Sequence, residues 1–119
     1  MPLPRALIRL VLAGRDAPLE LVEALRAEVA AVSPHVLSAR MRAALSVDAS
    51  DDARACPVPA LYLGARDERL LRRGLAAELR ALLPSLEVLE LPAPHLVLQR
   101  APVESAAAVA SFLARLVCR

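Results

Sequence analysis

The spacing of apolar residues predicts helices through the first half of the chain. Residues 6–13 are apolar with arginine interruptions, which indicates a short helical piece. We expect a longer helix to follow, capped by Asp16 with Pro18 in its first turn. Its apolar residues recur at helical spacing and form one stripe, made up of Leu21, Val22, Leu25, Val29 and Val32. Ser33 followed by Pro34 predicts the start of another helix.

The pattern changes after a polar stretch that ends in two prolines. The segment "VPALYLGA", residues 58–65, is apolar on both faces, which is typical of a strand buried in a parallel sheet. The segment "RRGLAAELRALLP", residues 72–84, predicts a helix that ends before its proline. A second strand is predicted for "LEVLELP", residues 86–92, and a final helix for "PVESAAAVASFLARLVC", residues 102–118.

The order of these elements defines the expected fold class. After residue 57 it is strand, helix, strand, helix, so we predict an α/β fold with two parallel strands. We divide the chain into a helical segment, residues 1–56, and a βαβα segment, residues 57–119. Two parallel strands do not make a stable sheet, and their open edge is a template for pairing. Either another chain supplies more strands, or this chain is the back part of a larger fold.

Composition excludes several classes of function. The chain has 119 residues and is 57% hydrophobic but only 2% aromatic, so its core depends on Leu, Val and Ala. All 15 basic residues are arginine, which we attribute to GC-rich, bacterial coding. The net charge of +2 is small and dispersed, so we expect no nucleic-acid partner. The apolar stretch at the start is too short and too charged to cross a membrane.

The cysteines indicate a compartment. Cys56 and Cys118 have no C-x-x-C spacing, and no secretory leader precedes them, so we expect free thiols in a cytoplasmic protein. The two histidines, His35 and His95, lie in different segments and the carboxylates are scattered, so we expect no metal. No phosphate-cradling glycine loop exists, and we expect no cofactor.

Two stretches resemble the C-terminal part of the α/β-hydrolase superfamily. They are "VPALYLGARDERLL", residues 58–71, and "PAPHLVLQRAPVESAAAVASFLARL", residues 92–116. In that family a strand leads to a loop with an acidic residue, and a helix and a last strand lead to a loop with the catalytic histidine. A proline, an acidic residue and a Phe-Leu pair follow that histidine, and here they are Pro102, Glu104 and Phe112-Leu113. The helices before residue 57 resemble the family's cap.

The resemblance implies a histidine base and an acidic partner. His95 is the base, whereas the acid is either Asp67, from the spacing of "GARD", or Glu68, from a count starting at Pro59. The alternative is a solvated acidic pair at a helix start and a histidine that does no work. Ala93 and Pro94 stand where the family usually places glycine, which leaves the geometry of this loop open. We expect His35 to lie on the surface.

The sequence does not contain the nucleophile that the resemblance requires. The family holds its serine in a G-x-S-x-G elbow, and none of the three glycines flanks a serine. We therefore predict that this chain alone is inactive, and that an N-terminal half must complete it before it hydrolyses a small ester or related acyl substrate. The alternative is a non-catalytic module that self-associates through its sheet edge or its apolar helix stripes.

Overall fold

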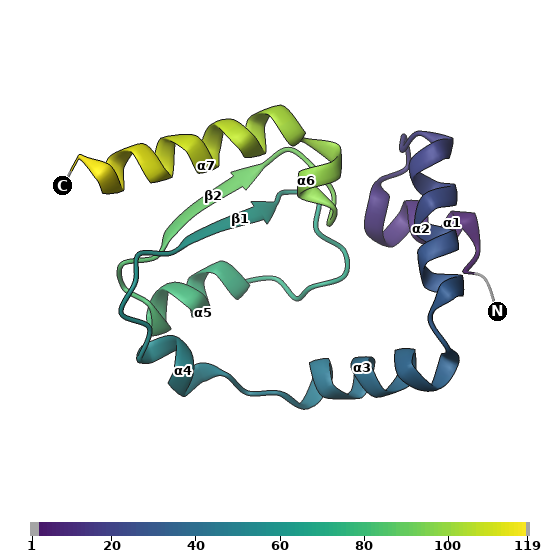
Figure 1. Ribbon diagram of the computed structural model, residues 1–119, viewed down its shortest axis with the longest axis horizontal. Coiled ribbons are helices and arrows are strands. Elements are labelled where there is room, and N and C mark those ends of the chain that lie inside the picture. Colours follow the sequence, from purple (N-terminus) through teal and green to yellow (C-terminus); the bar gives the residue numbers. More distant parts are fainter. Residues whose placement is uncertain (1–2, 119) are drawn as a thin grey trace.

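The computed structural model describes residues 3–118 and shows a mixed α/β fold (Figure 1). The helical segment begins with α1 (Arg5–Ile8), which continues into the π-helical turn η1 (Arg9–Ala13). It goes on with α2 (Leu19–Ala31), α3 (Pro34–Ser46) and α4 (Ser50–Arg54). The second segment consists of β1 (Leu61–Ala65), α5 (Leu75–Leu82), β2 (Glu87–Leu91), α6 (Val97–Arg100) and α7 (Pro102–Val117).

The two strands form the parallel sheet that the order of elements predicts. Leu61 is in register with Glu87 and Ala65 with Leu91. The ladder extends beyond the strands, since the Glu87 N–H donates to the Ala60 carbonyl at 3.0 Å and the Arg66 N–H to the Leu91 carbonyl at 2.9 Å. The helix α7 lies on one face of this sheet and α5 on the other (Figure 1).

Neither strand is as buried as an interior parallel strand. In β1 only Gly64 is buried, and its neighbours are half-buried. The expectation of a strand buried on both faces is therefore wrong for this chain by itself. The physical reason is that a two-stranded sheet has no interior strand, so each strand keeps one edge open to solvent.

Most of the buried apolar side chains form two clusters that belong to different parts of the chain. The first, which we call the N-terminal cluster, contains Ile8, Ala13, Ala17 and Val22. The second, the sheet-end cluster, contains Leu91, Ala93, Val97 and Ala101. Leu96, from the second half of the chain, packs against the N-terminal cluster and so links the two.

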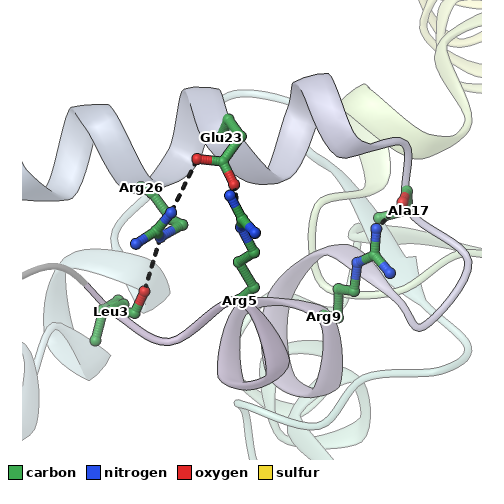
Figure 2. Close-up of polar contacts among 6 residues, drawn as sticks. All are labelled: Leu3, Arg5, Arg9, Ala17, Glu23 and Arg26. Atoms are coloured by element: carbon green, nitrogen blue, oxygen red, sulfur yellow. Dashed lines mark hydrogen bonds and ion pairs between the residues drawn. The ribbon is translucent and has the colours of Figure 1, made fainter.

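Polar contacts hold α1 and η1 against α2 (Figure 2). Glu23 on α2 accepts from Arg5 and, at 2.9 Å, from Arg26, whose Nε also donates to the Leu3 carbonyl at 3.1 Å. The hydrogen bond from Arg5 is the main reason that the pKa of Glu23 is lowered. Arg9 donates to the Ala17 carbonyl at 3.1 Å, which closes the loop between η1 and α2.

The helix starts test the capping predictions. The Ser33 hydroxyl accepts from the Val36 N–H at 3.3 Å and Pro34 is the first residue of α3, so this start is confirmed. The prediction for Asp16 is wrong, because α2 begins at Leu19 and Asp16 instead pairs with Arg100.

Among the residues that the structure describes, α3 buries no side chain, and no helix is long and apolar enough to cross a membrane.

We predict that Ile8→Ala lowers the free energy of unfolding by about 2–5 kcal/mol, since the Ile8 side chain is 1% exposed in the N-terminal cluster. The adjacent Leu7 is 43% exposed, and Leu7→Ala is the matched control, with an expected loss of under about 1 kcal/mol. Urea denaturation followed by circular dichroism measures both. Equal losses for the two variants would show that this cluster is not a core.

Candidate active site

His95 lies in the loop that follows β2, and backbone hydrogen bonds fix that loop on two sides. On the sheet side the Ala93 carbonyl accepts from the Asp67 N–H at 3.1 Å, which ties it to the loop after β1. On the other side the Leu96 N–H donates to the Leu12 carbonyl at 3.1 Å. His95 is therefore held between two anchored neighbours, and its ring is 26% exposed.

Glu68 lies in the loop that follows β1, at the same end of the sheet. One carboxylate oxygen, Oε1, accepts from three successive backbone N–H groups, those of Arg69 at 2.9 Å, Leu70 at 2.7 Å and Leu71 at 3.1 Å. The other oxygen, Oε2, lies 2.8 Å from Nδ1 of His95. Because parallel strands have their carboxyl ends at the same end of the sheet, the loops after β1 and β2 bring these two side chains together.

The ionisation of Glu68 sets the tautomer of His95. Burial by itself would raise the pKa of Glu68, but the hydrogen bonds from His95, Leu70 and Leu71 outweigh burial and lower that pKa below its ordinary value of 4.5. The carboxylate is thus ionised at neutral pH and can only accept hydrogen bonds. Nδ1 of His95 must then donate, and in the neutral ring Nε2 is left as an acceptor for a proton.

Asp67, the other candidate acid, points elsewhere. Its side chain is exposed and lines a small cavity of about 170 Å³ that also involves Arg9, Arg69 and Pro94. In the part of the chain that the structure describes, the carboxylate hydrogen-bonded to His95 belongs to Glu68. The sequence could not separate the two acids because they are adjacent, and the direction of each side chain depends on the turn after β1.

A larger cavity lies beside this pair, between the sheet and α5. It has a volume of about 730 Å³, and Glu68, Tyr62 and Glu90 line its inner wall. Burial, followed by the charges of Glu68 and Glu90, raises the pKa of Tyr62. The lining also contains four arginines, Arg66, Arg72, Arg73 and Arg80, together with small and apolar residues. Sequence reasoning missed this cavity, because its lining residues come from β1, β2, α5 and the loop between β1 and α5.

Among residues 3–118, no serine hydroxyl or cysteine thiol is hydrogen-bonded to the His95 ring, whose side-chain partner is Glu68. The serines at positions 33, 46 and 50 are engaged at or near helix ends. Ser105 is buried in α7 and its hydroxyl has no partner, whereas the thiols of Cys56 and Cys118 are free. Within the same residues no three His, Cys, Asp or Glu side chains gather in a way that could hold a metal ion. The exposed His35 lies on α3, away from the pair.

We predict that Glu68→Gln reverses the tautomer of His95. The amide oxygen would take the place of Oε1, where it still accepts from the backbone N–H groups of residues 69–71, so the amide NH₂ would face Nδ1. Nδ1 would then accept, and the proton would move to Nε2. Nitrogen-15 correlation spectra of the neutral ring measure this directly.

His35 and Asp67 provide the controls for this experiment. The exposed His35 is an internal reference in the same spectrum, and Asp67→Asn should leave the signals of His95 unchanged. A ring of His95 that is protonated at Nε2 in the wild-type chain would contradict the assigned pairing.

Comparison of the chain with protein-family models, with curated proteins and with solved structures finds no match.

Proposed function

We propose that this chain supplies the acid and the base of an α/β-hydrolase-type relay, and that its fold is the C-terminal half of that fold with cap helices. The observation that carries the proposal is the 2.8 Å contact between Glu68 and His95 at one end of two adjacent parallel strands. An acid and a base in that position are the two members of a Ser-His-Asp/Glu relay that this resemblance assigns to the C-terminal half.

The chemistry would be hydrolysis of a small ester or related acyl bond. Nε2 of His95 takes the proton of a serine hydroxyl, which attacks the substrate carbonyl to form a tetrahedral intermediate. The same nitrogen then gives the proton to the leaving alcohol, and an acyl-serine remains. Water, activated by His95 in turn, releases the acid and restores the serine. Glu68 stabilises the imidazolium that forms in each step.

The serine would come from an N-terminal half whose parallel strand pairs with the open edge of β1. Backbone groups alternate between the two edges of a strand, and Ala60 and Arg66 bond to β2. Leu61, Leu63 and Ala65 therefore point to the opposite edge, where no backbone group among residues 3–118 bonds to them. A strand added there in parallel would end beside Glu68 and His95, as a nucleophile strand must.

The composition of the strands favours β1 over β2 as the edge that accepts a partner. β2 has the sequence EVLEL, and its charged residues, Glu87 and Glu90, are typical of a strand that is protected from further pairing. β1 has the sequence LYLGA, which carries no charge. Nearby, α7 and α6 leave a shallow apolar groove uncovered, with Leu98 61%, Val109 40% and Leu113 53% exposed. A helix of the N-terminal half would cover this groove.

The same uncovered surfaces favour one alternative, a non-catalytic module that self-associates. An open, uncharged strand edge can pair with a second copy of itself. Sedimentation equilibrium of the isolated chain distinguishes the two proposals, because a stable dimer built on β1 would block the edge that the N-terminal half requires. In either case we place the protein in the cytoplasm, as its free thiols favour.

We predict that the isolated chain neither hydrolyses p-nitrophenyl butyrate above the buffer rate nor reacts with a fluorophosphonate probe. With the polypeptide encoded directly upstream, hydrolysis should appear and the probe should label the serine of that partner. Glu68→Gln should lower kcat by about 10⁴-fold, as loss of the correct tautomer does in such relays, and His95→Ala should lower it at least as much. Asp67→Asn is the matched control and should keep the wild-type rate.

Two results would contradict this function. One is a labelled residue on this chain alone. The other is an upstream polypeptide that lacks G-x-S-x-G, or that carries it and yet gives no rate above buffer.

We predict that Ala65→Pro prevents assembly with that partner but leaves the isolated chain folded. The Ala65 N–H points to the open edge, so proline removes no hydrogen bond to β2. It would, however, remove a donor that a docked strand needs. Calorimetric titration with the upstream polypeptide measures the loss of binding, with Ala81→Pro in the interior of α5 as a control that should unfold its helix instead. Undiminished binding by Ala65→Pro would place the partner elsewhere.

A further inference from the structure

We propose that residues 9–16, which comprise η1 and the turn after it, act as a positioning brace for His95. The catalytic meaning of this brace rests on the proposed function, but the contacts that define it do not. The segment lies more than 75 residues before the histidine in the sequence, and three independent contacts connect the two.

The first contact pairs two backbone groups that helix ends leave without partners. The last carbonyls of a helix and the first N–H groups of another have no intrahelical partner. Leu12 lies at the end of η1, and Leu96 immediately precedes α6. The Leu96 N–H donates to the Leu12 carbonyl at 3.1 Å, so each end satisfies the other at the residue next to His95.

The second contact explains why residue 14 is glycine. Gly14 has φ of +89°, a conformation that other residues rarely adopt. A Cβ atom built on Gly14 would stand 3.1 Å from Cγ of Pro94, the residue before His95, and 3.2 Å from the Asp16 carboxylate. The bare backbone of the brace thus packs directly against the ring of Pro94.

The third contact is an ion pair that fixes the far end of the histidine loop. Asp16 accepts from Arg100, the last residue of α6, at 2.8 Å. The Arg100 side chain is 16% exposed and the Asp16 side chain is 84% exposed, so only the arginine of this pair is shielded from solvent. Residues 94, 96 and 100 are therefore all held by the brace, at positions that flank His95 on both sides.

The brace is itself anchored, so it can act as a support. Ile8 and Ala13 are buried in the N-terminal cluster, and Leu96 packs against that cluster. Arg9 closes the brace onto Ala17, as Figure 2 shows. Sites that hold reacting groups need such supporting contacts, because a loop alone leaves a side chain free to swing. The brace therefore restricts the movement of the histidine loop on the side where that loop has no contact with the sheet.

A pair of glycine variants tests this positioning role. Gly74 also has a positive φ, of +84°, but a Cβ atom there meets nothing within 4 Å. Gly14→Ala and Gly74→Ala both place a side chain at a positive φ, although the backbone strain is greater at Gly14, where ψ is 153°, than at Gly74, where ψ is 0°. Only the first variant pushes against Pro94. We expect Gly14→Ala to shift or broaden the Nδ1–H signal of His95, while His35 stays unchanged, and Gly74→Ala to leave both histidines as they are.

A second pair of variants tests the brace without disturbing a buried position. Asp16→Ala removes the pair with Arg100, and Asp51→Ala removes an exposed pair with Arg54 whose atoms lie 2.6 Å apart. We expect Asp16→Ala to speed hydrogen exchange of the Leu96 N–H by about tenfold, and Asp51→Ala to have no effect there.

The outcomes are separable from those of the hydrolase proposal, because both measurements use the isolated chain and need no substrate. His95 signals in a folded Gly14→Ala chain that match the wild type would overturn the brace. If Gly14→Ala does not fold, unchanged Leu96 exchange in Asp16→Ala would overturn it equally. A working brace in a chain that never supports ester hydrolysis would instead count against the proposed function alone.

Discussion

The structure around His95 depends on how the carboxylate of Glu68 is held. A partly buried carboxylate is unfavourable unless donors compensate for the water it loses. Here three backbone N–H groups, those of residues 69–71, converge on Oε1, so the backbone after Glu68 turns around its carboxylate. That turn aims Oε2 at the neighbouring loop. The position of His95 is then specified by a charge-assisted hydrogen bond and not by packing alone.

Local patterns in the sequence predict the elements of this fold well. The strand at 58–65, the helix within 72–84, the strand at 86–92 and the terminal helix all appear, because each has its own periodicity and its own proline or glycine boundary. Ser33 and Pro34 mark a helix start for the same reason: the capping contact spans only three residues. Such signals are short-range, so one sequence is enough to find them.

Contacts between distant segments could not be predicted in this way. Asp16 has the residue type of a helix cap, yet its partner is Arg100, which is 84 positions away. The support that Leu12 and Gly14 give to the histidine loop consists of a carbonyl and an absent side chain, and neither leaves a pattern in a sequence. The choice between Asp67 and Glu68 stayed open for a related reason, since the direction of each side chain depends on the turn after β1.

The geometry of Glu68 and His95 is complete within the described residues, whereas the sheet lacks strands, and this difference has a physical origin. Every group that orients Glu68 and His95 lies within residues 8–17 and 60–100, so their geometry needs no further strand. The sheet, by contrast, gains stability only by adding strands and by covering its faces, and the edge of β1 remains unpaired. A partner strand would therefore join a pair that is already oriented. Binding energy would then be used to bring a nucleophile to the base, and not to build the base, which is the condition for an efficient relay.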